Sequence, residues 1–317
     1  MDRLEPQNNP RRAVVTGSAG FVGRHLVRTL TARGYSVTGL DRRPGTPEGA
    51  RAIVVDVAGA NAAVAATLEE ADAVWHLAAC PGVRAQGPGI ALQRTRDNIE
   101  AGRLVLDRTP LETPVVVTSS SSVYGGAMHG AFLRPSHETD ELRPIGGYAL
   151  SKVALERLCW RRRARGGWMA VARPFTVAGE GQREDMAISM WRDASLRGER
   201  LKILGAPDRM RDVTDVRDVV EGLIRLVERG VQETVNLGSG VAHRIDDIAR
   251  IVCEEVGVAF RPEVVPASSE EVVATLADVR RARDLLGIEP NTDIRAVITR
   301  QIDAARSLPR PMDREVV

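Results

Sequence analysis

The chain has 317 residues, of which 43% are hydrophobic and 27% charged, so it can bury a substantial core in one large domain or two unequal ones. Its 44 basic and 42 acidic residues are spread along the sequence and leave a net charge of +2, which argues against a partner that is nucleic acid or a membrane surface. No window approaches 18 apolar residues, and the polar residues 1–12 lack the apolar run of a secretory signal, so we expect a cytoplasmic protein.

The cysteines are too few and too far apart for a structural framework. Cys80, Cys159 and Cys253 form no C-x-x-C pair, which argues against a metal knuckle or a set of disulfides. We therefore expect a reducing compartment and no metal site.

In chain order, the first 180 residues alternate short apolar runs rich in β-branched residues with longer amphipathic stretches. This pattern is typical of a parallel sheet covered by helices on both faces. The predicted elements are strand 13–16, helix 20–33, strands 36–40 and 52–55, helix 61–70, strand 73–77, helix 94–108, strand 114–118, helix 148–165 and strand 169–173.

The second half is less regular and predicts a smaller, interleaved domain. Its predicted elements are helices 186–197, 216–229, 245–256 and 294–307, and strands 201–204, 234–237 and 260–264. The sequence thus predicts an α/β protein with a Rossmann-type doubly wound parallel sheet. We assign residues 11–180, with parts of 205–240 returning, to the sheet domain and 181–317 mainly to a C-terminal substrate domain.

A glycine turn connects the first strand to the first helix. Gly17, Gly20 and Gly23 in G-x-x-G-x-x-G let a backbone approach a pyrophosphate, whose charge then meets the start of a helix that continues through Phe21 and Val22. Because this short motif lies between the first strand and the first helix, we predict that it binds a dinucleotide.

Acidic residues follow the next two strands. Asp41 closes the second strand, where a carboxylate can accept hydrogen bonds from ribose hydroxyls, which favours NAD over its 2′-phosphorylated form. Arg42 and Arg43 could neutralise such a phosphate and leave that choice open. Asp56, beside Val57 after the third strand, is placed for the adenine edge, although a turn aspartate is nearly as good an interpretation.

Tyr148 and Lys152 stand four residues apart on one face of a predicted helix, in a chain with only three tyrosines and two lysines. A phenol is normally too weak a base at neutral pH, and a nearby ammonium and a cationic nicotinamide would both favour phenolate. Upstream, a run of serines ends a strand at the edge where open α/β sheets bind ligands. Ser120 is our choice for orienting a substrate hydroxyl, with Ser121 as a further contact.

These pieces resemble the extended short-chain dehydrogenase/reductases that epimerise or dehydrate nucleotide sugars, from Ala13 to about Thr299. The resemblance rests on the glycine turn, the Ser-rich strand end, Y-x-x-x-K and the segments H-L-A-A, R-P-F, R-D-V and N-L-G-S-G, in the family's order. It implies a bound NAD, reversible oxidation at a sugar carbon and often a homodimer. It adds cofactor contacts at Leu77, Ala78, Ala79 and Asn98, besides Tyr148 and Lys152.

Dehydratases of this family carry an Asp-Glu pair after the hydroxyl residue, where this chain has Ser121 and Ser122, so dehydration is disfavoured. Residues 173–187 are similar to the R-x-F-T-V-x-G, R-x-D-M-A signature of UDP-glucuronate 4-epimerases. On that resemblance Arg183 would grip a C6 carboxylate through two parallel hydrogen bonds, Thr176 would donate another, and Met186 would line the sugar site. Arg192 is a rival partner for the carboxylate.

Two further arginines are candidates for substrate contact. Arg84 follows Pro-Gly-Val in a loop that resembles that of the same subgroup, and Arg211 is our candidate for a phosphate contact. The family's usual arginine and Gly-Asp appear here as Ser268, Glu270 and Glu271, which leaves the nucleotide base open.

The predicted reaction is NAD-dependent C4 epimerisation of UDP-glucuronic acid to UDP-galacturonic acid through a 4-keto sugar. Other nucleotide-sugar 4-epimerases, a 4-ketoreductase and a decarboxylating relative are alternatives. A dinucleotide-binding sensor or scaffold is the non-enzymatic one.

Overall fold

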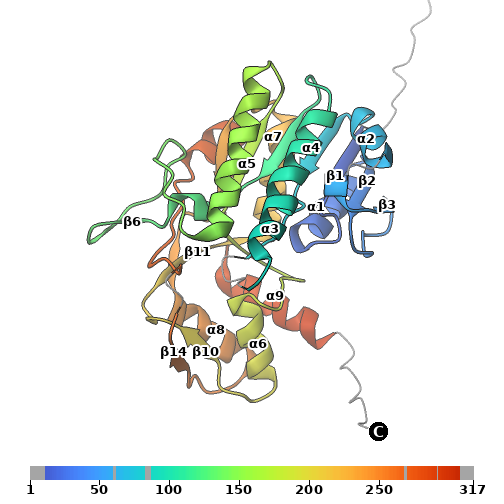
Figure 1. Ribbon diagram of the computed structural model, residues 1–317. Coiled ribbons are helices and arrows are strands. Elements are labelled where there is room, and N and C mark those ends of the chain that lie inside the picture. Colours follow the sequence, from blue (N-terminus) through green and yellow to red (C-terminus); the bar gives the residue numbers. More distant parts are fainter. Residues whose placement is uncertain (1–10, 60–61, 83–86, 268–269, 291, 308–317) are drawn as a thin grey trace, which may run out of the picture.

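A computed structural model describes residues 11–59, 62–82, 87–267, 270–290 and 292–307. The larger part is a seven-stranded parallel sheet covered by helices on both faces, and the smaller part hangs below the carboxyl ends of its strands (Figure 1). The strands of the large sheet are β1 (Arg12–Thr16), β2 (Ser36–Asp41), β3 (Arg51–Val54), β4 (Ala73–His76), β5 (Val115–Thr118), β8 (Ala170–Pro174) and β12 (Thr234–Leu237).

The strand order is β12-β8-β5-β4-β1-β2-β3, so the chain winds outward in one direction from β1 and then in the other. Two crossover connections diverge where β1 lies between β2 and β4, and a crevice opens there at the carboxyl ends of the strands. The predicted fold class is confirmed, and β12 is the segment of the second half that returns to the sheet.

Alternation along the buried strands builds two cores. Ala13 and Val15 of β1 face the layer of α1 (Phe21–Ala32) and α7 (Val216–Glu228), whereas Val14 faces the opposite layer. That opposite layer consists of α2 (Ala62–Glu69), α4 (Ala101–Arg108) and α5 (Gly146–Ala164). Successive residues of each strand are buried on opposite faces of the sheet, which explains why these strands are almost continuously apolar.

The predicted helix 94–108 is interrupted. It comprises α3 (Ile90–Arg94), a π-helical turn over Thr95–Glu100 and then α4. The wider turn brings two consecutive polar side chains, Asp97 and Asn98, into buried positions. The spacing of apolar residues in the sequence could not predict this π-helical turn, because the wider turn shifts which residues share a face within one helix.

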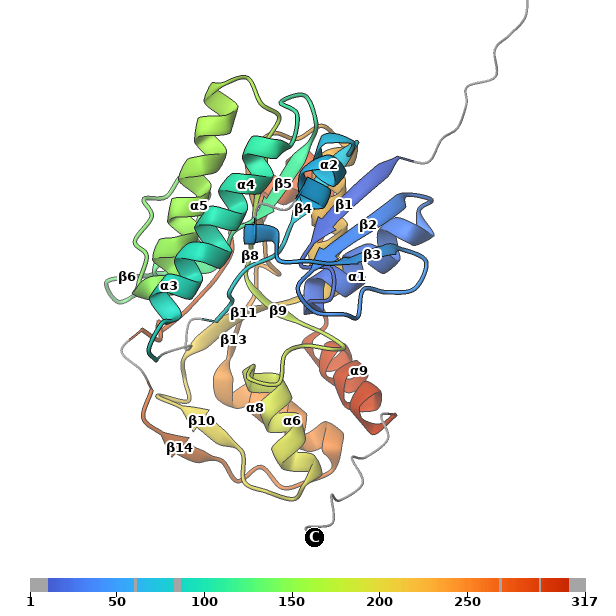
Figure 2. The same ribbon diagram turned by 45° about the vertical axis from the view of Figure 1, so that its right-hand side comes forward.

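The smaller lobe has its own core between helices and short strands (Figure 2). Its helices are α6 (Ala187–Leu196), α8 (Ile245–Val256) and α9 (Ile294–Arg306), close to the predicted bounds. Its strands are β9 (Thr176–Ala178), β11 (Met210–Asp215) and β13 (Ala242–Arg244) in one sheet, and β10 (Lys202–Leu204) and β14 (Glu263–Val265) in another. The first of these sheets was not predicted, and neither was the hairpin of β6 (Met128–His129) and β7 (Phe132–Leu133).

The structure contains no helix, within its described ranges, that is long and apolar enough to cross a bilayer.

Candidate active site

A cavity of about 1290 Å³ runs from the carboxyl ends of the large sheet into the smaller lobe. It collects most of the residues singled out from the sequence. Those that line it are Gly17, Gly20, Phe21, Val22, Gly23, Asp41, Arg42, Asp56, Val57, Leu77, Ala78, Ala79, Ser120, Ser121, Tyr148, Lys152, Thr176, Arg183, Met186 and Arg211.

The glycine turn is tightly packed because two of its positions have no room for a side chain. Gly17 has φ +74°, and a Cβ added there would lie 2.8 Å from the nitrogen of Ala78. A Cβ on Gly23 would lie 2.0 Å from the oxygen of Gly17. Helix α1 therefore begins directly against the turn, and its first turn, uncapped by any side chain, faces the cavity as an anion-binding helix start.

Asp41 fastens this turn and also faces the cavity. One carboxylate oxygen accepts the backbone N–H of Ala19 at 3.0 Å, and the other accepts that of Arg43 at 2.9 Å. The side chain is buried, yet each oxygen keeps a lone pair for a ligand hydroxyl. The predicted ribose contact is thus held in one orientation by the backbone.

Of the two arginines beside Asp41, Arg42 is engaged with a different acid, whereas Arg43 also lines the cavity and lies 3.8 Å from Asp41 itself. Arg42 donates to the buried carboxylate of Asp97 at 2.5 Å, and Arg96 bridges Asp97 and Asp56. Although burial opposes it, the hydrogen bond and charge of Arg96 hold the pKa of Asp56 below its usual range. With Arg42 neutralised, the pocket favours a ribose hydroxyl over a 2′-phosphate.

Asn98 lies behind the cavity wall instead of on it. Its side-chain oxygen accepts the N–H of Cys80 at 2.6 Å, and its amide donates to Ser151 at 2.8 Å and to the carbonyl of Cys80. Asn98 therefore ties the loop after β4 to helix α5, and any influence on a cofactor passes through that loop.

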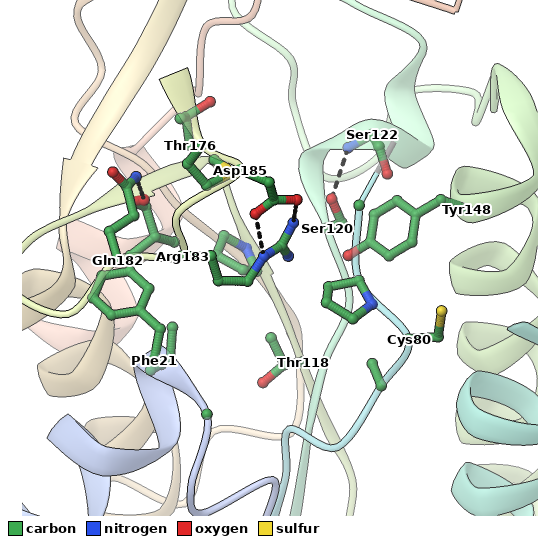
Figure 3. Close-up of a pocket in the computed structure, with 18 of the residues that line it drawn as sticks. Phe21, Cys80, Thr118, Ser120, Ser122, Tyr148, Thr176, Gln182, Arg183 and Asp185 are labelled. Atoms are coloured by element: carbon green, nitrogen blue, oxygen red, sulfur yellow. Dashed lines mark hydrogen bonds and ion pairs between the residues drawn. The ribbon is translucent and has the colours of Figure 1, made fainter. Parts of the chain in front are cut away.

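Tyr148 projects from the first turn of α5 toward Ser120 at the end of β5 (Figure 3). The phenol hydroxyl of Tyr148 faces Ser120, whose Oγ accepts the N–H of Ser122 at 3.2 Å (Figure 3). Burial raises the pKa of Tyr148, opposed first by Ser120 and then by the charges of Arg183 and Arg94. The protein alone therefore keeps the phenol protonated, in a geometry that suits proton exchange.

Lys152 supports the site from beneath. Its Nζ donates to the carbonyl of Thr118 at 2.8 Å and lies 5.9 Å from the centre of the Tyr148 ring, so the ammonium is beside the phenol ring. Burial lowers the pKa of Lys152 to about 8. Burial, followed by the charge of Lys152, lowers the pKa of neighbouring His76 to about 3, so this histidine is neutral.

A buried acid joins the catalytic helix to the strands that carry the serines. Glu156, two turns after Tyr148 in α5, pairs with Arg173 of β8 through bonds of 2.7 and 2.9 Å. Ser119 donates to the same carboxylate at 2.5 Å. Arg173 also donates to the hydroxyl of Tyr124 at 2.9 Å. This network fixes the serine loop relative to α5.

Arg183 forms two parallel hydrogen bonds to a carboxylate, as predicted for the substrate, but the carboxylate is that of a protein side chain. Its Nε and Nη2 donate to the two oxygens of Asp185 at 2.8 and 2.6 Å (Figure 3). Both residues line the cavity, as do Thr176 and Met186. A bidentate carboxylate site therefore exists beside Tyr148.

The other predicted substrate arginines differ in their surroundings. Arg211 donates to Glu271 at 2.9 Å and to the carbonyl of Met210 at 2.8 Å, and the side chains of this ion pair are 14% and 12% exposed. Arg192 pairs with the adjacent Asp193 and does not line the cavity. Arg84 lies outside the described residues.

Sequence reasoning missed the residues whose role depends on distant packing. Arg94 is buried in α3 and donates to the carbonyl of Gly82 at 2.9 Å. A Cβ on Gly147 would lie 2.8 Å from Nη1 of Arg94, so this guanidinium packs on the start of the catalytic helix. Gln182 holds the loop after β9 through a 2.7 Å bond to the carbonyl of Val177. No local pattern marks either residue.

Comparisons with known proteins identify the family and the fold. Residues 13–238 match the NAD dependent epimerase/dehydratase family. The solved structure of MoeE5 in complex with UDP-glucuronic acid and NAD is 36% identical, with a TM-score of 0.85 and coverage of 93% of this chain and 99% of that one. UDP-glucuronic acid 4-epimerase from Bacillus cereus, in complex with UDP-glucuronic acid and NAD, is 26% identical over the same shares, with a TM-score of 0.86. An uncharacterized UDP-glucose epimerase of Bacillus subtilis, YtcB, is 28% identical over 94% of this chain and 98% of its own length.

The chain belongs to the NAD dependent epimerase/dehydratase family, and it is an enzyme whose cofactor is NAD. The residues fit that cofactor, because Gly17 and Gly23 leave a cradle that any Cβ would fill and Asp41 faces the cavity at the end of β2. The predicted family and cofactor are confirmed.

We expect Gly17→Ala to lose NAD affinity by roughly 10-fold or more, since its Cβ would push the Ala78 backbone into the cradle. Gly34→Ala is the matched control: Gly34 also has a positive φ (+83°) but meets nothing within 4 Å of an added Cβ. Calorimetric titration of NAD into both variants measures the difference. Equal affinity in the two variants would contradict a cofactor role for the turn.

The depressed pKa of Lys152 makes a second prediction. Its unfolded-state pKa is near 10.5 and its folded-state pKa about 8, so the folded chain binds fewer protons between these values. The stability of the wild type relative to Lys152→Met should therefore rise as pH increases from 8 to 10.5, by roughly 1–3 kcal/mol. Urea unfolding of both proteins at pH 7.5 and pH 10 tests this. A constant difference would show that the ammonium is not desolvated.

Proposed function

We propose that the chain epimerises UDP-glucuronic acid to UDP-galacturonic acid at C4 through a transient 4-keto sugar. One observation carries the proposal: a preformed arginine fork, Arg183, lines the same cavity as the Tyr148–Ser120 pair. A C6 carboxylate matches that fork, whereas a neutral C6 alcohol has no use for it.

The substrate is a nucleotide sugar that spans both lobes. NAD, when bound, accepts a hydride from C4 and returns it. Residues 11–180, with parts of 205–240, hold the cofactor, and residues 181–317 mainly hold the nucleotide sugar. We also propose that the enzyme acts as a cytoplasmic homodimer, as the family resemblance implies.

Tyr148 takes the proton of the C4 hydroxyl while Ser120 orients that hydroxyl, and Tyr148 returns the proton after the ketone presents its opposite face. In the protein alone, burial raises the pKa of Tyr148 and keeps the phenol protonated, and Ser120 and then the charge of Arg183 oppose that effect. Ser121 lines the cavity where a dehydratase has a carboxylic acid, so no side chain there can protonate a leaving hydroxyl.

Arg183 has a second role in this mechanism. A 4-ketone lies β to the C6 carboxylate, and carbon dioxide is lost when the C5–C6 bond aligns with the carbonyl π system. Two parallel hydrogen bonds from one guanidinium would hold the carboxylate, and C6 with it, where the C5–C6 bond is kept out of that alignment. A decarboxylase or a ketoreductase would use the same proton chemistry, and the products separate them: carbon dioxide with a pentose, or a single reduced alcohol with consumed cofactor.

Incubation of UDP-glucuronic acid with the wild type should yield the C4 epimer with little pentose. Arg183→Ala should lower kcat/KM by roughly 100-fold and raise the share of pentose, since the carboxylate is no longer held. Arg192→Ala is the control, because Arg192 is an arginine of the same segment outside the cavity wall. Chromatographic separation of products measures both effects. Equal turnover by Arg183→Ala would remove Arg183 from the site, and full activity in Tyr148→Phe would overturn the mechanism.

Asp185 should compete with the substrate carboxylate for Arg183. Asp185→Asn leaves the side-chain size nearly unchanged but removes the charge, so we expect KM for UDP-glucuronic acid to fall by roughly 2- to 10-fold with kcat little changed. Binding of UDP-glucose, whose C6 group is neutral, should not change. A raised KM would mean that Asp185 orients Arg183 and does not compete with the substrate.

A further inference from the structure

Two opposing signals stand side by side at the end of β2. Asp41 is the type of residue that binds the ribose of NAD, whereas an arginine next to it, such as Arg42 or Arg43, can accommodate the 2′-phosphate of NADP. All three residues line the cavity. Arg43 is mostly exposed and lies beside Asp41. Arg42 instead turns to an acid from a different part of the chain, and that acid is the subject of the inference below.

Asp97 determines where Arg42 lies. One of its carboxylate oxygens accepts a hydrogen bond from Nη2 of Arg42 at 2.5 Å, and the other accepts one from Nη1 of Arg96 at 3.0 Å. The side chain of Asp97 is 2% exposed, whereas that of Arg42 is 44% exposed. A buried carboxylate that lost its partners would remain as an uncompensated charge, so Asp97 cannot readily give up Arg42. The acid is thus the fixed member of the pair.

The backbone explains how an acid comes to lie there. Thr95–Glu100 form the π-helical turn between α3 and α4, and within it Asp97 and Asn98 are consecutive in the sequence and both buried. Asn98 holds the loop after β4 through the N–H of Cys80. Asp97 lines the cavity. The turn therefore brings a carboxylate to the cavity wall within hydrogen-bond distance of the residue that follows β2.

We propose that Asp97 is a positioning residue that makes the site select NAD over NADP, by keeping Arg42 paired with a buried carboxylate. A 2′-phosphate needs a nearby guanidinium to offset its charge. To recruit Arg42 it would have to break the pair with Asp97, whose carboxylate has almost no contact with solvent and would then face a second anion. A ribose hydroxyl requires no such rearrangement, because Asp41 keeps a lone pair for it.

Calorimetric titration of the full-length protein with NAD and with NADP, in the absence of any sugar, tests the assignment. Asp97→Asn keeps the shape of the side chain and removes its charge, and Arg96 retains Asp56 as a partner. We expect NADP affinity to rise roughly 5- to 20-fold, since Arg42 is released, while NAD affinity stays within about 3-fold. Glu100→Gln is the charge-matched control, because Glu100 belongs to the same turn but is exposed and outside the cavity lining.

Two double variants separate the release of Arg42 from a mere loss of negative charge. The gain in NADP affinity should vanish in Arg42→Ala/Asp97→Asn and persist in Arg43→Ala/Asp97→Asn. Arg42→Ala alone leaves the buried acid in place, and it should change NADP affinity by no more than about 2-fold, because Arg42 is held away from the phosphate in the wild type. NAD affinity shows that each variant is folded.

The proposal is overturned by an unchanged NADP affinity in Asp97→Asn, by a gain that survives the loss of Arg42 or needs Arg43, or by an equal gain in Glu100→Gln. A larger loss of NADP affinity in Arg42→Ala alone would also overturn it. Because neither dinucleotide titration involves a sugar, these outcomes are independent of the epimerase proposal. A change of cofactor preference in an enzyme that leaves every nucleotide uronate unchanged would defeat only the proposed reaction.

Discussion

The arrangement of the reacting groups depends on one buried ion pair, Glu156 with Arg173. Tyr148 is carried by α5 and Ser120 follows β5, and buried side chains join the two elements, among them Lys152, which donates to the carbonyl of Thr118. Glu156 joins them, because it accepts two bonds from Arg173 of β8 and one from Ser119, the residue before Ser120. The side chains of the pair are 2% and 4% exposed, so losing either partner would leave an uncompensated charge in the core. Such a pair contributes orientation more than stability.

The large number of arginines affects how charges are paired in the rest of the cavity. A chain with 42 arginines and a net charge of only +2 must pair most guanidinium groups with its own acids, and Arg42, Arg183 and Arg211 are paired in that way. Because of this pairing, an anionic ligand must displace a carboxylate before it can bind the arginine, which disfavours unspecific binding of anions. The burial of each carboxylate determines how readily it is displaced. Asp185 is 66% exposed and can rotate into water, whereas Glu271 is 12% exposed and has no such route.

The sequence predicted those parts of the molecule that depend on local rules. The parallel sheet follows from apolar runs of the right length. Gly17 is required by its positive φ, and Gly23 by a backbone contact within the same turn. The family assignment followed from short motifs, each of which is contiguous in the sequence. The β9–β11–β13 sheet escaped prediction because its strands are three to six residues long, and β11 mixes charged with apolar residues.

Side-chain partners were the least predictable part of the site. Tyr-x-x-x-Lys placed Lys152 on the correct face, but the carbonyl of Thr118, 34 residues away in sequence, decides where its ammonium lies. The same holds for Arg183. Its side-chain type predicted that it would bind a carboxylate, but its partner in the structure, Asp185, was not predicted. Spacing along a helix gives the direction of a side chain, whereas its partner depends on which strands pack beneath it.

The electrostatics of Lys152 return to the same buried acid. Burial makes the ammonium costly and lowers its pKa to about 8, while Cys159 and then the negative charge of Glu156, one helical turn away, oppose that loss. Glu156 thus has two effects. It fixes the position of the serine loop relative to α5, and it favours the charged form of Lys152 beneath the phenol. Glu156, which does not line the cavity, therefore contributes to the position of the reacting groups and to the charge beneath them.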